Sequence, residues 1–141
     1  TVRKSIIDIT RNINQDLIDN LYKDLSKFIK VILLNDAETS QNKTIFEFNV
    51  DLRCALYEKA VTNVLFNNGP AMLALFSKKI NYYIYEIVND STLVTSEKWL
   101  NRMGWHKEFK YPYSNKKQII NWKDDNYNNR IKEIQNLIKT H

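Results

Sequence analysis

The stretch GPAMLALFSKKINYYIYEIV, residues 69–88, decides the predicted fold. Pro70 suits the first position of a helix, because the N–H that proline lacks would have no partner there. Apolar side chains then recur at helical spacing along one face: Leu73, Phe76, Ile80, Ile84 and Ile87. This spacing predicts a central core helix from Pro70 to about Val88.

The segments on either side of this stretch predict further helices. The apolar spacing and the caps at Asn14 and Thr95 place them at residues 2–13, 15–34, 51–66, 95–104 and 124–139. Residues 44–50 alternate between apolar and polar and predict a short extended piece, whereas 35–43 and 105–117 should be irregular. With only two glycines and two prolines in the chain, we expect an all-α, single-domain bundle of about five to six helices over residues 1–141.

Length and composition exclude several classes of protein. The chain has 141 residues, of which 43% are apolar and 26% charged, as in an ordinary globular domain with one core. No apolar run approaches the ~18 residues of a membrane span. A single cysteine excludes an internal disulfide framework and favours a reducing compartment. We expect an intracellular protein, in the cytoplasm or nucleus, or a component of a virion. Frequent Asn, Lys, Ile and Tyr are typical of AT-rich genomes, including those of viruses.

Charge is distributed unevenly along the chain. Residues 1–95 carry 11 basic and 11 acidic groups, whereas residues 96–141 carry ten basic and five acidic groups. The formal net charge of +5 therefore resides in the last third. Between positions 98 and 123 there are seven basic side chains, one acidic side chain and all three tryptophans.

This combination of cations and rings predicts nucleic-acid binding. Cations neutralise phosphates, and flat aromatic rings stack on bases. The expected phosphate-contacting residues are Lys98, Arg102, Lys107, Lys110, Lys116 and Lys117. The expected stacking rings are Trp105, Tyr111 and Tyr113.

Signals for catalysis, metals and cofactors are weak, so we expect a non-enzymatic protein without a cofactor. His106, Lys107 and Glu108 form the most compact acid–base group, and such a set can cleave RNA without a metal. Three such residues in a polar loop are nevertheless common by chance. There is no cysteine pair and no glycine-rich phosphate loop, and the two histidines are far apart in the sequence.

Residues 80–105 resemble a helix-turn-helix. A helix and a turn at 89–94 precede TSEKWLNRMGW at 95–105, which is similar to the "WL-x-x-x-GW" endings of transposase-type DNA-binding regions. The resemblance implies that Trp99 and Leu100 anchor the second helix. It leaves four polar residues free to meet phosphates or base edges: Ser96, Lys98, Asn101 and Arg102.

A viral coat protein or nucleoprotein is an alternative nucleic-acid binder. In such a protein the cationic end would face the genome and apolar helices would pack subunit on subunit. A second copy of the chain would then be a partner, which distinguishes this hypothesis from a helix-turn-helix regulator.

The same aromatic residues also resemble a different family. Trp99-Leu100, Gly104-Trp105, Phe109 and Tyr113 are similar to the second homology motif of B-cell-lymphoma-type apoptosis regulators, which viruses often carry. VTNVLFNNG, residues 61–69, is similar to the start of their first motif. This resemblance implies a helical bundle whose groove holds an amphipathic death-peptide helix of a protein partner.

A fourth interpretation assigns no binding partner to these residues. In it the tryptophans close the core and the lysines form a solvated face.

Overall fold

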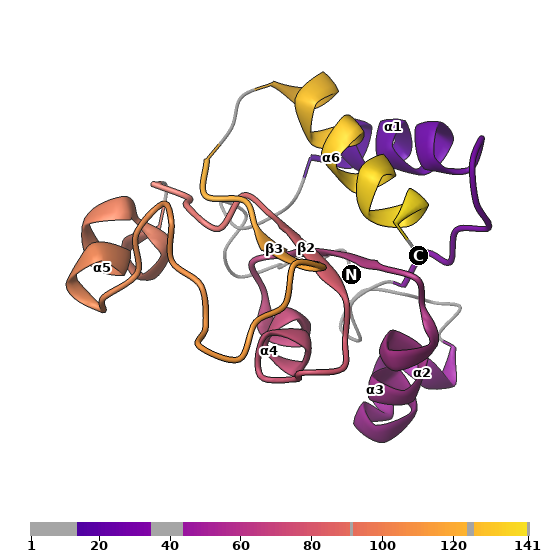
Figure 1. The fold of residues 1–141 in the computed structure, drawn as a ribbon, viewed down its shortest axis with the longest axis horizontal. Helices are drawn as coiled ribbons and strands as arrows, with labels where there is room; N and C mark the ends of the chain where they lie inside the picture. The colour runs from indigo at the N-terminus through magenta and orange to yellow at the C-terminus, as the bar shows by residue number, and fades with distance from the viewer. Residues whose placement is uncertain (1–13, 35–43, 91, 124–125, 141) are drawn as a thin grey trace.

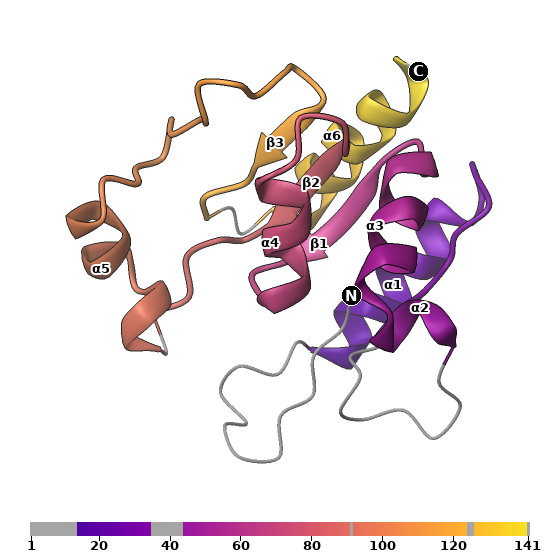
Figure 2. The same ribbon diagram turned by 90° about the horizontal axis from the view of Figure 1, so that it is seen from below.

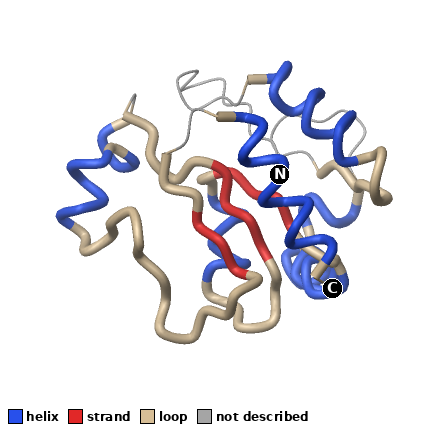
Figure 3. The backbone as a smooth tube through the Cα atoms, turned by 45° about the horizontal axis from the view of Figure 1, so that its top comes forward, coloured by secondary structure: helices blue, strands red, loops and turns tan. Residues whose placement is uncertain are grey.

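The computed structural model describes residues 14–34, 44–90, 92–123 and 126–140, and it contains a parallel β-sheet (Figure 1, Figure 3). The strands lie in the order β1 (Asn63–Phe66), β2 (Tyr82–Tyr85) and β3 (Gln118–Ile120). The prediction of an all-α bundle is therefore wrong, and the fold is mixed α/β.

Helices cover both faces of the sheet. They are α1 (Gln15–Leu25), α2 (Ile45–Phe48), α3 (Val50–Lys59), α4 (Gly69–Leu75), α5 (Glu97–Arg102) and α6 (Tyr127–Lys139), with a short 3₁₀ helix η2 (Leu93–Thr95) before α5. Helices α1 and α6 lie side by side against one face, and α4 lies against the other (Figure 1, Figure 2). In the described ranges, no helix is long and apolar enough to cross a membrane.

The central strand β2 supplies both halves of the core. Tyr83 and Tyr85 contact the apolar residues of α1 and α6, among them Leu21, Leu25 and Ile134. On the opposite face, Tyr82 and Ile84 pack with Leu65 and α4. All four β2 side chains are buried, as expected for a strand of a parallel sheet that is covered on both sides.

Burial on both faces explains why the predicted helix at 70–88 is wrong in its second half. Pro70 does lie in the first turn of α4, but α4 ends at Leu75 and β2 begins at Tyr82. A strand buried on both faces reads as a continuous apolar run without alternation, so its spacing can match that of a helix by coincidence. The aromatic and β-branched composition of YYIY is the signal that favours a strand.

Three other predicted elements differ for related reasons. The helix predicted at 51–66 ends at Lys59, and its last four residues form β1. The helix predicted at 15–34 ends at Leu25, after which the mostly apolar residues 29–34 run irregularly beside the sheet. The extended piece predicted at 44–50 is the helix α2, because Thr44 and Glu47 form a capping box that stabilises a helical start.

The remaining elements match the elements predicted from the sequence more closely. Helices α5 and α6 are present, and Asn14 caps α1 by accepting a hydrogen bond of 2.9 Å from the Asp16 N–H. The caps of the later helices are shifted, because Ser96 rather than Thr95 caps α5 and Asn126 caps α6. The helix predicted at 2–13 and the predicted α6 start at 124–125 lie outside the described residues.

Candidate functional site

The predicted contact residues lie on one stretch of chain, residues 97–117, which we call the basic segment. It consists of α5, which lies at the end of the molecule away from α1 and α6, and the irregular connection that leads from α5 back to β3 in the sheet (Figure 1, Figure 2). Five of the six predicted cations are exposed and Lys117 is half-buried. The six are Lys98 and Arg102 on α5, Lys107 and Lys110 in the connection, and Lys116 and Lys117 beside β3.

These cations are available for an external anion. Within the part of the chain that the structure describes, none of the six side chains forms an ion pair or a side-chain hydrogen bond. By contrast, Lys123 Nζ lies 2.9 Å from Asp90 Oδ2, so this neighbouring lysine already has a carboxylate partner. The Lys123 ammonium and the Glu97 N–H hold the pKa of Asp90 below its ordinary value.

An aromatic cluster supports the irregular part of the basic segment. Trp105 stacks on Phe109 with ring centroids 4.8 Å apart, and Tyr111 meets the edge of Trp105 at 5.6 Å. Tyr111 and Tyr113 stack on each other at 5.3 Å. The three rings predicted to stack on bases are therefore half-buried, and their faces and edges are already in contact with other rings of the cluster.

The cluster nevertheless presents one open ring. Phe76, at the C-cap of α4, lies 5.9 Å from Tyr111 and is 68% exposed, whereas the other four rings of the cluster are half-buried. No sequence signal marked Phe76, because its spacing assigned it to the core face of the predicted central helix. In space it is the ring of this cluster that is best placed to meet a base.

Side-chain hydrogen bonds tie both ends of the basic segment to residues that flank the strands β2 and β3. Trp122 Nε1 donates to Glu97 Oε1 at 3.2 Å, and the Tyr113 hydroxyl donates to the Leu75 carbonyl at 3.0 Å. The buried Gln118 amide donates to the carbonyls of Ser77 and Ile80 at 2.7 and 2.9 Å. Sequence reasoning missed Gln118, because a lone glutamine in a short strand carries no distinctive pattern. The cations thus project from an irregular but anchored scaffold.

The two family resemblances require helices that the structure lacks. Residues 82–85 form β2, so the first helix of the suggested helix-turn-helix is absent from this described stretch. The bundle implied by the apoptosis-regulator resemblance is replaced by a three-stranded sheet. Leu100 is buried, and Trp99 and Trp105 are partly buried against the core beside it.

The acid–base group of the sequence does not form a cleft. His106 and Glu108 are both exposed, and among the described residues no hydrogen bond joins them. His106 contacts the edge of Phe109 at 6.2 Å. In the described ranges no group of three or more His, Cys, Asp and Glu side chains is arranged to hold a metal ion.

A second polar region lies at the carboxyl edge of the sheet. Glu86 follows β2 directly with a φ of 51°, and its carboxylate accepts a 2.8 Å hydrogen bond from the Arg130 guanidinium. Arg130 also lies 4.3 Å above the Tyr85 ring. At the same edge, Asn67 Nδ2 donates to the Ile87 carbonyl at 2.6 Å, which joins the loops that follow β1 and β2.

The geometry of the basic segment and of the sheet edge therefore carries the functional argument by itself. Comparison with models of known protein families, with curated proteins and with solved structures found no match to this chain.

Proposed function

We propose that the protein binds nucleic acid, mainly through the phosphate backbone, by means of the basic segment. The observation that supports this proposal is the set of six cations without carboxylate partners on one anchored stretch of chain. An exposed cation with no internal partner breaks no ion pair of the protein when it binds a phosphate. Each such contact also gains free energy, because it releases counterions from the nucleic acid. The remainder of the chain carries no comparable excess of positive charge.

In this proposal the half-buried rings have a supporting role. Trp105, Tyr111 and Tyr113 fix the course of the connection, so that Lys107 and Lys110 are held at the surface. Phe76 is the ring that offers a free face to an unpaired base, because stacking on a base requires an exposed aromatic surface.

The first experiment measures the affinity of the protein for a labelled 20-nucleotide single strand and duplex at about 50 and about 200 mM salt. The variant K98Q/K107Q/K110Q removes three lysines of the basic segment. Its matched control, K23Q/K132Q/K139Q, removes three exposed lysines of α1 and α6. We expect only the first variant to lose affinity, with a log–log salt slope for the duplex that is shallower by about 2–3, since each phosphate contact contributes about 0.9. Equal losses in both variants would contradict the proposal.

A further variant separates stacking from charge. Phe76→Ala should weaken binding of the single strand severalfold without changing the salt slope, because it removes a ring and no charge. The matched control is Phe28→Ala, which removes an exposed ring outside the cluster. An unchanged affinity of the Phe76 variant would confine the interaction to phosphates.

The carboxyl edge of the sheet favours a second candidate, the binding of a mononucleotide. In open parallel α/β sheets, ligands bind outside the carboxyl ends of the strands, and an acidic side chain after the second strand can accept hydrogen bonds from ribose hydroxyls. Glu86 occupies this position, and the space beside Gly69, the first residue of the helix α4 that follows β1, is open. Thermal stabilisation by millimolar ADP or UDP that is lost in Glu86→Gln would support this candidate. No stabilisation by either nucleotide would exclude binding of these two probes.

A further inference from the structure

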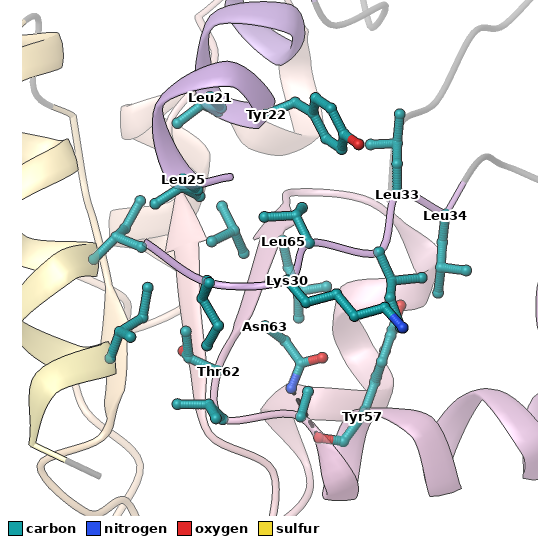
Figure 4. Close-up of a pocket in the computed structure, with 18 of the residues that line it drawn as sticks. Leu21, Tyr22, Leu25, Lys30, Leu33, Leu34, Tyr57, Thr62, Asn63 and Leu65 are labelled. Carbon is teal, nitrogen blue, oxygen red and sulfur yellow. Dashed lines mark hydrogen bonds between the residues drawn. The ribbon is translucent and has the colours of Figure 1, made fainter. Parts of the chain in front are cut away.

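A pocket of about 440 Å³ runs along the outer edge of β1 (Figure 4). Its walls come from both layers of the fold. Leu21, Leu25 and Ile134 belong to the layer of α1 and α6, whereas Leu56 and Tyr57 belong to α3 on the other side of the sheet. The strand itself, residues 63–66, forms the floor between the two layers.

The backbone of β1 presents unpaired groups to this pocket. The Asn63 N–H donates to the Asn81 carbonyl at 3.0 Å, which fixes the alternation of the parallel ladder with β2. The N–H and C=O of Val64 and the N–H of Phe66 therefore point away from β2, toward the open edge. Among the described residues β1 has a strand neighbour on one side only, and no hydrogen bond of the outward Val64 backbone is found.

A polar side chain beside these groups also lacks a partner. The Thr62 hydroxyl lines the pocket and is buried, and it has no hydrogen bond within the described part of the chain. Its neighbour Asn63 is satisfied, because Nδ2 donates to the carbonyls of Tyr57 and Asn81, each at 2.9 Å. A buried hydroxyl without a partner costs free energy, which a ligand with hydrogen-bonding groups would recover.

The outer wall of the pocket is held by side-chain packing, with Leu34 in the core, rather than by backbone hydrogen bonds, and two lysines line the pocket. Residues 30–34 cross the pocket without a backbone hydrogen bond to any described residue, and Ile32 is 58% exposed. Lys30 and Lys59 line the pocket, and neither forms an ion pair with a described residue. An occupant with acidic groups at its ends would complement these two cations.

We propose that this pocket binds an extended peptide segment of a partner protein, with apolar side chains and acidic flanks, which adds as a strand to the free edge of β1. A strand directs successive side chains to opposite faces, and the pocket offers an apolar wall on each side. The backbone of the bound peptide hydrogen-bonds with the outward backbone groups of Val64 and Phe66, as in other cases of strand addition to a sheet edge. A ligand without N–H and C=O groups leaves these backbone groups and the Thr62 hydroxyl unpaired. This proposal is independent of nucleic-acid binding.

The test uses a synthetic peptide of alternating valine and isoleucine with a glutamate at each end, acetylated and amidated. Titration into the isotopically labelled protein should shift the amide resonances of Val64 and Phe66 and slow their hydrogen exchange. The same peptide with methylated backbone nitrogens keeps its side chains but cannot donate to β1, so it should bind at least tenfold more weakly.

Two protein variants locate the interaction. Val64→Pro removes an outward N–H while leaving the ladder with β2 intact, because proline is tolerated on an edge strand where its nitrogen faces outward. It should reduce peptide affinity at least tenfold. The matched control is Ile120→Pro, which removes the corresponding outward N–H from β3 at the opposite edge and should leave affinity unchanged. Thr62→Val, which removes only the hydroxyl, should lower the affinity for the peptide while leaving the fold intact. This variant serves as the test if the proline variants do not fold.

Several outcomes would overturn the proposal. Amides of Val64 and Phe66 that already exchange slowly in the free protein would show that another part of the chain, or a second copy, occupies the edge. Binding that shifts Leu21 and Leu25 without protecting Val64 would indicate an apolar ligand site instead. Equal affinity of both proline variants for the peptide would place the peptide elsewhere.

Discussion

At the scale of single residues, Glu86 combines two unusual features. Its backbone lies in the left-handed region, with a φ of 51°, and its carboxylate pairs with Arg130, whose side chain is only 6% exposed. A side chain with a Cβ is strained in this backbone region. An unpaired buried cation is also costly. The free-energy cost of the left-handed backbone at Glu86 is therefore offset by the ion pair that its carboxylate forms with Arg130.

We predict that Glu86→Ala lowers the free energy of unfolding by about 2 kcal/mol, because it leaves the Arg130 cation without its carboxylate. Glu86→Gly removes the same carboxylate but also relieves the backbone, so it should be more stable than the alanine variant by about 0.5–1 kcal/mol. Urea denaturation of the three proteins measures both differences. An alanine variant as stable as the glycine variant would show that the backbone at this position is not strained.

At the scale of elements, the end of α5 depends on Gly104. This glycine has a φ of 84°, and a Cβ built on it would meet no other atom. The cost of a side chain there is thus backbone strain alone, without a steric clash. Because α5 carries Lys98 and Arg102, the turn at Gly104 also sets the course of the basic segment.

Gly104→Ala should therefore destabilise the protein by about 1 kcal/mol. Gly69→Ala is the matched control, since Gly69 begins α4 without a positive φ and its Cβ would also meet nothing. It should change stability by less than about 0.5 kcal/mol. Thermal or urea unfolding gives both values, and an equal effect at the two positions would contradict the role of the left-handed backbone at Gly104.

At the scale of the whole molecule, buried tyrosine hydroxyls make stability sensitive to alkali. Burial raises the pKa of Tyr82 from 10.0 to about 12. Burial, with a carboxylate as hydrogen-bond partner, also raises the pKa of Tyr83 and of Tyr127. Below pH 10 these groups are protonated in both the folded and the unfolded chain, so their contribution to stability is fully present.

Above pH 10 the unfolded chain releases protons that the folded chain retains, so stability should fall by about 1.4 kcal/mol per pH unit for each such tyrosine. Urea denaturation at pH 8, 10 and 11 measures this fall. Tyr82→Phe should make the fall smaller, whereas Tyr22→Phe, which alters an exposed tyrosine, should leave it unchanged. A fall that is identical in the two variants would argue against titration of Tyr82.

The sequence predicted the parts of this fold that local interactions determine. The Asn14 cap, the positions of α5 and α6, and the irregular course of residues 105–117 follow from capping residues, spacing and proline. The sheet could not be predicted in this way, because each pairing joins distant residues, such as Asn63 with Tyr82 and Tyr82 with Gln118. Strands buried on both faces lack the alternation that would have revealed them.

The candidate site was predicted unevenly for a similar reason. The exposure of Lys98, Arg102 and Lys107 agrees with what a run of charged residues indicates. The contact of Phe76 with Tyr111 and the pocket beside Val64 depend on elements that meet only in the folded chain. Neither leaves a pattern along the sequence.

The basic segment lies within the connection between β2 and β3, and this position has an evolutionary consequence. Its surface lysines contribute nothing to the core, so substitutions there are nearly neutral for folding, whereas Leu100, Gln118 and Trp122 are buried and constrained. Descendants of this chain could therefore exchange one binding partner for another by drift in a single loop. Their sheets would stay almost unchanged while their surfaces diverged.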